Sequence, residues 1–262
     1  MGIHRTAVVE GAVGADVEIG PFAVIAAGAV LGDGVRVGAH AVVEAGTEVG
    51  ARTVIHPHAV LGGAPQDLKH DGSITRLVLG EDNVVREFVT LHRGSSGGRG
   101  ITKIGARNYF MANSHVAHDC IVGDETMFAN AASVAGHCEV GDGAMIGGLA
   151  GVHQFSRVGR YAMVAAGAMC AQDVPPFTLA QGDRARLYGL NVVGLRRRGF
   201  SGDTLQALKA AWRTLFVAGL PMRAAIARAR DEHADVPEAI ELVDFVAATS
   251  RGVCRAALHE DK

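Results

Sequence analysis

The sequence has few aromatic residues, few cysteines and no long hydrophobic run. Only 5% of its 262 residues are aromatic, although 48% are hydrophobic. A core of this composition has to be built from small aliphatic side chains rather than from large rings. The four cysteines form no C-x-x-C pair, which predicts reduced thiols in a cytoplasmic protein; they are Cys120, Cys138, Cys170 and Cys254.

Charge and hydropathy exclude further classes of protein. Lys and Arg number 25 against 27 Asp and Glu, so no basic excess indicates a nucleic-acid partner. The longest apolar run, from Ala23 to Leu31, is too short to span a bilayer. The N-terminus lacks the charged start and apolar stretch of a signal peptide. We therefore expect a cytoplasmic protein without membrane insertion.

Glycine is abundant, with 35 residues, and it follows a six-residue repeat. An apolar residue returns at every sixth position over 13–61, 79–91 and 104–170. The next residue is Gly in 12 of these 24 hexads and Ala in 6. Periods of 3.6 and 2 do not fit this pattern. A period of six is typical of hexapeptide parallel β-helices.

The repeat predicts the fold and its division into domains. Three hexads, or 18 residues, close one triangular coil, so residues 1–188 should form about eight coils with the apolar heads inside. Known proteins with this repeat coil left-handed. The period breaks near 63–78 and 95–103, where we expect extruded loops. Residues 189–262 should form an α-helical domain, with helices over 202–217, 221–233 and 235–252.

Residues one coil apart should lie about 4.8 Å above one another. His137 is 19 residues after His118, and Gln154 is 36 after it. Polar groups from three coils should therefore line one edge of the prism: His115, His118, His137, His153 and Gln154. Such a strip is a candidate for acid–base chemistry or for zinc, while a lone histidine could equally be a solvated surface residue.

Three other sequence patterns each allow two interpretations. Tyr109, Met127, Met145 and Met163 recur at steps of 18 and should form an outward apolar column, either a subunit contact or part of an acyl channel. Cys120 and Cys138 are also 18 apart, and we expect buried thiols rather than a disulfide. The run 196–198 of three arginines is either a solvated charge run or a phosphate-recognition site.

Several motifs together resemble the UDP-N-acetylglucosamine acyltransferase family of lipid A biosynthesis. The resemblance covers essentially the whole chain. It is carried by the segments NSHVAHDC at 113–120, AGH at 135–137, VHQF at 152–155, QDVPP at 172–176 and GLRRRGF at 194–200, with QDLK at 66–69 and LHRG at 91–94. The resemblance implies transfer of an (R)-3-hydroxyacyl chain from acyl carrier protein to the 3-hydroxyl of UDP-N-acetylglucosamine. It also implies a homotrimer with sites between neighbouring prisms.

The resemblance also assigns roles to residues. His118 matches the catalytic base, and the N–H of Gly136 matches the oxyanion donor. Asp119 is expected to orient His118 or balance its charge, although neighbours on a strand point to opposite faces. Residues matching positions around the substrates are Asp67, Lys69, His115, His137, His153, Gln154, Ala166, Asn191, Arg197 and Arg198. A thioester is already activated, so no metal or other cofactor is expected.

Two positions depart from the family pattern. Ala166 stands where well-known members carry Gly at the acyl-length ruler, and Val193 stands where Glu is frequent. The alternatives are a sibling N-acyltransferase, an acetyl-coenzyme A-dependent acetyltransferase, a metalloenzyme related to carbonic anhydrase and a non-catalytic β-solenoid. The sibling normally carries an extra N-terminal domain, whereas here the repeat starts by Val13. The metalloenzymes typically show an H-x4-H pair, which this histidine strip lacks.

Overall fold

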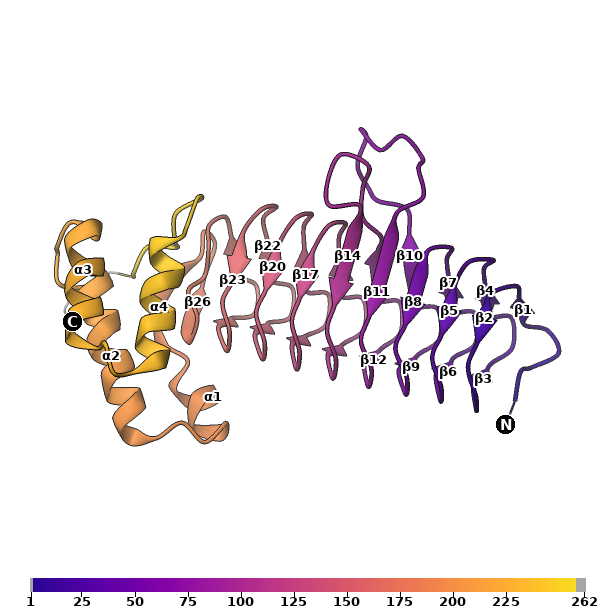
Figure 1. Cartoon of the computed structure of the whole chain (residues 1–262), viewed down its shortest axis with the longest axis horizontal. Helices are drawn as coiled ribbons and strands as arrows, with labels where there is room; N and C mark the ends of the chain where they lie inside the picture. Colours follow the sequence, from indigo (N-terminus) through magenta and orange to yellow (C-terminus); the bar gives the residue numbers. More distant parts are fainter. Residues whose placement is uncertain (1, 258–262) are drawn as a thin grey trace.

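The computed structural model describes residues 2–257 and forms a long three-sided prism with helices at one end (Figure 1). Most strands have only two residues, and the chain turns after each of them. The predicted fold, a left-handed parallel β-helix followed by helices, is confirmed.

Three sheets form the faces of the prism, and each gains one strand per coil. Sheet A contains β3 (Glu18–Ile19), β6 (Arg36–Val37), β9 (Val54–Ile55), β12 (Val84–Val85), β15 (Tyr109–Phe110), β18 (Met127–Phe128), β21 (Met145–Ile146), β24 (Met163–Val164), β26 (Thr178–Gln181) and β27 (Arg186–Leu190). Sheet B contains β1 (Val8–Val9), β4 (Val24–Ile25), β7 (Val42–Val43), β10 (Val60–Gly63), β13 (Thr90–His92), β16 (His115–Val116), β19 (Ser133–Val134), β22 (Gly151–Val152) and β25 (Met169–Cys170). Sheet C contains β2 (Ala12–Val13), β5 (Val30–Leu31), β8 (Thr47–Val49), β11 (Arg76–Leu79), β14 (Ile101–Ile104), β17 (Ile121–Val122), β20 (Glu139–Val140) and β23 (Arg157–Val158).

The register between coils follows the predicted step of 18 residues. Met127 pairs with Met145, and Met145 pairs with Met163, so the predicted apolar column stands on the outer face of sheet A. The heads of the hexads point inward and are buried along the prism, except for Val13 in the first coil, which is 38% exposed. Cys120 and Cys138 are buried free thiols, as predicted.

The two predicted loops leave the prism at the corner between sheets B and C, and they project together from one edge (Figure 1). They are shorter than the sequence indicated, because β11 begins at Arg76 and β14 begins at Ile101. The loops occupy 64–75 and 93–100. The N–H of Ser96 donates to His70 Nδ1 at 3.2 Å, and the N–H of Asp71 donates to Ser96 Oγ at 3.2 Å, so the two loops are bonded to each other.

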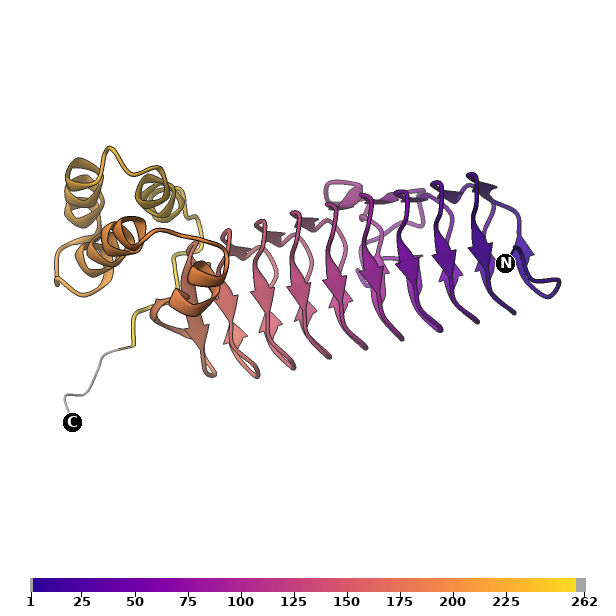
Figure 2. The same cartoon turned by 90° about the horizontal axis from the view of Figure 1, so that it is seen from below.

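Up to residue 257, where the described part of the chain ends, the C-terminal end carries four helices (Figure 2). These are α1 (Val192–Arg197), α2 (Gly202–Phe216), α3 (Met222–Glu232) and α4 (Pro237–Ala247). Ser201 caps α2, because its side chain accepts from the N–H of Thr204, as predicted. The sequence did not predict α1. Among the described residues, no helix has the length and apolarity needed to cross a membrane.

Two asparagines, Asn83 and Asn108, are buried inside the prism beside the two loops. The amide nitrogen of Asn83 donates to Gly80 O at 2.8 Å and to Gly105 O at 2.9 Å, and its Oδ1 accepts from the N–H of Asn108 at 2.9 Å. The side chain thus satisfies backbone groups of two coils that the loops interrupt.

We expect Asn83→Ala to lower the free energy of unfolding by about 1–3 kcal/mol, because it leaves buried backbone groups without partners. The exposed Asn130→Ala is the control and should cost much less. Chemical denaturation of both variants at one protein concentration measures the difference. Equal effects of the two substitutions would contradict a structural role for the buried amide.

Candidate active site

One cavity of about 650 Å³ lies along sheet B at its corner with sheet C. The predicted strip contributes His115, His118, His153 and Gln154, and Gly136 lies between them. Gln66 from the loop 64–75 closes one side, and Met169, Asp183 and Arg184 line the cavity toward the helical end. The structure therefore brings together residues from three successive coils, as the 18-residue step predicted.

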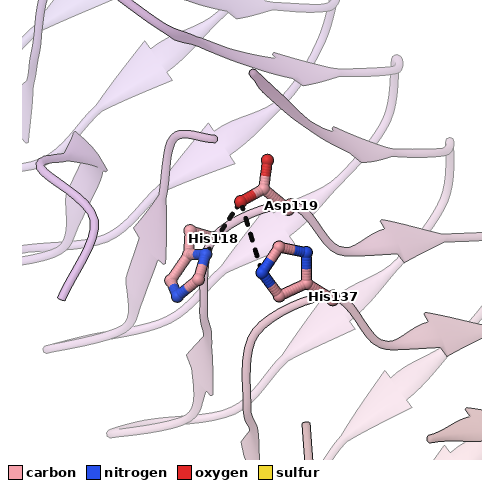
Figure 3. A group of neighbouring side chains, drawn as sticks. All are labelled: His118, Asp119 and His137. Atoms are coloured by element: carbon pink, nitrogen blue, oxygen red, sulfur yellow. Dashed lines mark hydrogen bonds and ion pairs between the residues drawn. The ribbon is translucent and has the colours of Figure 1, made fainter. Parts of the chain in front are cut away.

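His118 and Asp119 form a hydrogen-bonded pair, with 2.8 Å between His118 Nδ1 and Asp119 Oδ2 (Figure 3). The divergence of neighbouring side chains on a strand does not apply to these residues, because they form a corner rather than a strand. Asp119 has φ 61°, in the left-handed region, which turns its carboxylate back toward the imidazole. An ionised carboxylate only accepts hydrogen bonds, so His118 Nδ1 is the donor of this bond, and in the neutral ring Nε2 carries the free lone pair.

His137 lies one coil further along and completes the group shown in Figure 3. Its ring is edge-on to that of His118, with 5.0 Å between the centroids, and its Nε2 is 3.9 Å from Asp119 Oδ2. The other face of His137 stacks on Phe155 at 4.4 Å. His137 is thus fixed beside the pair by packing rather than by a direct hydrogen bond to His118.

Asp119 is completely buried, yet it stays ionised. Burial by itself raises the pKa of Asp119, but hydrogen bonds from Ser95 and from His118 outweigh it and hold the pKa below its ordinary value. Burial lowers the pKa of His137, and the nearby charge of Asp119 opposes that effect. The site therefore combines one buried anion with a His137 imidazole that takes up a proton less readily than usual.

On the N-terminal side of the site, Thr90 was not singled out from the sequence, and His92 appeared there only as part of the motif LHRG at 91–94. Thr90 Oγ1 is 2.7 Å from His115 Nδ1, and His92 packs edge-on against His115 at 4.9 Å between centroids. Thr90 is 25 residues before His115, because the second loop adds seven residues to the coil. The 18-residue step alone could not predict this contact, because the prediction also requires the exact length of the inserted loop.

The side chains of His118, Asp119 and His137 are also of the types that bind metal ions. The ligand atoms of His118, Asp119 and His137 lie within 4.8 Å of one another, which is close enough for a shared cation. Asp119 Oδ2, however, already accepts from the N–H and the hydroxyl of Ser95 as well as pairing with His118. The arrangement is that of a hydrogen-bonded acid–base group.

Gly136 lies against the imidazole of His118. A Cβ at position 136 would stand 2.6 Å from Cε1 and 2.7 Å from Nε2 of that ring, so only glycine fits without moving it. The N–H of Gly136 has no acceptor among the described residues and belongs to the cavity wall. It can therefore donate to a ligand atom held beside His118 Nε2.

The remaining predicted residues lie in three other places. Asp67 and Lys69 are on the loop 64–75, where the Lys69 N–H donates to Asp67 Oδ1 at 3.0 Å, and the charge of Asp67 reaches His137. Ala166 lies at the corner between sheets A and B, outside the cavity.

Asn191 and two arginines lie near the corner between sheets C and A or on α1. Asn191 caps α1 and donates to Tyr161 O, and Arg197 is the last residue of that helix. The guanidinium of Arg198 is 4.5 Å from the centroid of the Tyr161 ring and pairs with Glu125 at 3.4 Å. These side chains belong to a different corner of the prism from His118.

Comparisons with known proteins point to one family. The family described as UDP N-acetylglucosamine O-acyltransferase, domain 2, matches residues 173–254, and the bacterial transferase hexapeptide repeat matches 12–45 and 28–63. A protein from Polynucleobacter asymbioticus named acyl-(acyl-carrier-protein)–UDP-N-acetylglucosamine O-acyltransferase is 50% identical over 97% of this chain and 99% of its own length. One of the same name from Thermodesulfovibrio yellowstonii is 45% identical, with coverage of 97% and 99%. A solved structure of LpxA from Acinetobacter baumannii has a TM-score of 0.94 and 39% identity, covering 97% of this chain and 99% of that one.

Acid should destabilise the protein partly through His92. Burial and the neighbouring His115 lower the pKa of His92 from 6.5 to about 4. Between these pH values the unfolded chain binds a proton that the folded chain does not, so this contribution to stability is present above pH 6.5 and is lost as the pH falls toward 4. We expect His92→Gln to be less sensitive to a change from pH 7 to pH 5 than the unmodified protein. Denaturation midpoints at both pH values measure this, with the exposed His4→Gln as control, and an unchanged acid dependence would contradict it.

Proposed function

The chain belongs to the UDP-N-acetylglucosamine O-acyltransferase family, and on that premise we propose how its cavity carries out the reaction. The enzyme transfers an acyl chain from acyl carrier protein to an oxygen of UDP-N-acetylglucosamine, the first step of lipid A biosynthesis. We propose that the donor is an (R)-3-hydroxyacyl thioester, that the acceptor is the sugar 3-hydroxyl and that the enzyme acts in the cytoplasm. The observation that carries the mechanism is the hydrogen bond between buried Asp119 and His118, whose ring lines the cavity.

His118 acts as the general base. Its Nε2 takes the proton of the sugar hydroxyl while the oxygen attacks the thioester carbonyl. The imidazolium that forms is stabilised by Asp119, which stays ionised and accepts from Nδ1. The negative charge that develops on the carbonyl oxygen is met by the Gly136 N–H. When the intermediate collapses, the carbon–sulfur bond breaks and His118 returns the proton to the leaving thiolate.

The surrounding residues bind the two substrates. His115, His153 and Gln154 line the same cavity and supply hydrogen-bonding groups beside the base. Lys69, Arg197 and Arg198 carry positive charge suited to diphosphate or phosphopantetheine phosphate, with Asp67, His137 and Asn191 as further polar contacts. Ala166 would limit the acyl chain from the corner where it stands.

We expect His118→Ala to lower kcat by about 10²- to 10⁴-fold, because the sugar hydroxyl loses its base. The assay supplies UDP-N-acetylglucosamine and 3-hydroxyacyl carrier protein and measures the acylated sugar nucleotide. His4→Ala lies far from the cavity and should retain activity. Normal turnover by His118→Ala would show that His118 is not the general base.

The site of one chain is incomplete, and this supports a homotrimer. Arg198 is held at the corner between sheets C and A, whereas His118 is at the corner between sheets B and C. A second copy has to bring its arginines to the cavity. Sheet C has outward charges along much of its length, at Glu48, Lys103, Glu139 and Arg157. Sheet A has them in its first two strands, at Glu18 and Arg36, and then carries the methionine column. Sheet B carries no outward Asp, Glu, Lys or Arg among the described residues. Sheet A of one copy therefore packs on sheet B of the next.

This pairing puts the corner between sheets A and B at the three-fold axis. That corner carries an exposed stack of rings, Phe22, His40, His58 and Phe88, with 5.0 Å between successive centroids. The corner between sheets C and A is instead lined by charged residues such as Asp16, Arg52 and Asp82. Rings from three copies can pack together at the axis, while the charged corner stays in water.

We expect Phe22→Cys to form a disulfide-linked pair of chains on mild oxidation, because equivalent residues approach one another only near a symmetry axis. Asp16→Cys is the matched control, since Asp16 is exposed and has a similar positive φ but lies at the other corner. Non-reducing electrophoresis separates linked from single chains, and the four native thiols are buried. Cross-linking of Asp16→Cys but not of Phe22→Cys would reverse the assignment of the axis.

A further inference from the structure

The loop 93–100 supplies no group to the proposed acyl transfer itself, yet it surrounds the carboxylate of Asp119. The Ser95 N–H donates to Oδ1 at 3.2 Å and to Oδ2 at 3.1 Å, and the Ser95 hydroxyl donates to Oδ2 at 2.6 Å. Ser95 is itself 1% exposed. Within the described residues, these bonds and the one from His118 are the hydrogen bonds that the carboxylate receives.

Gly98 closes the loop over the same carboxylate. A Cβ at this position would stand 2.3 Å from Asp119 Oδ2 and 2.5 Å from Cγ, closer than any side chain can approach. Its backbone does not have the positive φ that would by itself call for glycine. The glycine is needed for space. The neighbouring Gly97 has nothing within 4 Å of the equivalent position.

Two further contacts hold the loop and the corner in place. Arg99 donates to the backbone oxygen of Asp119 at 3.1 Å and forms an ion pair with Glu139 on sheet C. The N–H of Asp119 donates to Thr102 Oγ1 at 2.8 Å, on the strand that follows the loop. The loop therefore contacts both the carboxylate and the backbone oxygen of Asp119, and the strand that follows the loop binds the Asp119 N–H.

Asp119 needs these hydrogen-bond donors because its charge is buried away from water. A buried carboxylate without donors would take up a proton or turn away, and either change would remove the acceptor for the His118 Nδ1–H. His118 would then be free to place its proton on Nε2, where it could not accept the substrate proton. Two donors from one serine keep the acceptor charged and in position.

We propose that Ser95 is a positioning residue for the acyl transfer: its N–H and hydroxyl hold Asp119 charged and fixed, so that His118 presents Nε2 as the base, while Gly98 seals this pair from water. The inference rests on the proposed role of His118 and extends it to a loop in the preceding coil. Ser95 is not one of the residues that line the cavity, so it acts through Asp119.

The first test is Ser95→Ala, with Ser95→Thr as the variant that restores a hydroxyl. We expect Ser95→Ala to lower kcat about 10- to 100-fold with little change in KM, because a hydrogen bond to a buried charge is lost. The acidic limb of the kcat–pH profile should move to higher pH, because Asp119 binds a proton more readily. Ser95→Thr should recover most of kcat. An unchanged kcat and pH profile in Ser95→Ala would overturn the proposal.

The second test separates position from folding. Gly98→Ala should lower kcat, because its methyl group displaces the loop from the carboxylate, whereas Gly97→Ala should keep normal activity. Nitrogen-15 NMR of the folded enzyme without substrate reports which His118 nitrogen carries the proton. We expect the Nδ1–H form in the unmodified enzyme and in Gly97→Ala, and a loss of that form in Ser95→Ala. Retention of the Nδ1–H form in Ser95→Ala would refute the positioning role.

The two proposals fail in different ways. If His118→Ala keeps full activity, the proposed base is wrong whatever Ser95 does. If His118→Ala is inactive while Ser95→Ala keeps the kcat, the pH profile and the NMR signature of the unmodified enzyme, the base stands and only the positioning role falls.

Discussion

The parallel register between coils is the constraint on which everything else depends. Each strand is too short to be stable alone, and its backbone groups are satisfied only by the coils above and below it. The step of 18 residues therefore has to be kept along the prism, and it converts sequence spacing into position. His118 and His137 meet because they are one coil and one residue apart. A shift of a single residue would move one of them to another part of the corner.

The corners, rather than the strands, carry the chemistry. At a corner the residue in the left-handed region turns its side chain back over its neighbour, so consecutive residues such as His118 and Asp119 can bond to each other. The middle residue leaves its N–H free, as Gly136 does. A stack of corners thus presents side chains and backbone donors in rows, and the cavity on sheet B uses three of these corners.

The two loops break the repeat, and they do so beside the site. The loop 64–75 brings Gln66 to the cavity, and the loop 93–100 encloses Asp119. Both leave from the corner between sheets B and C, and Ser96 bonds one to the other. The regular coils supply a rigid frame, whereas the irregular segments adjust the charge and solvent exposure of the groups on that frame.

The sequence alone determined the coil, the inward heads, the apolar column on sheet A and the meeting of His118 with His137, because all of these follow from a fixed period. It also predicted the cap at Ser201. Only the tertiary structure decided the contacts that cross the loops, since an inserted segment changes the register by an amount that its ends determine. Thr90 beside His115 and Ser95 beside Asp119 are of this kind. The direct bond between His118 and Asp119 depended on a backbone angle at the corner, and the placement of Arg198 away from His118 depended on where α1 packs. Neither the backbone angle at the corner nor the packing of α1 follows from the six-residue repeat, so the sequence pattern could not predict them.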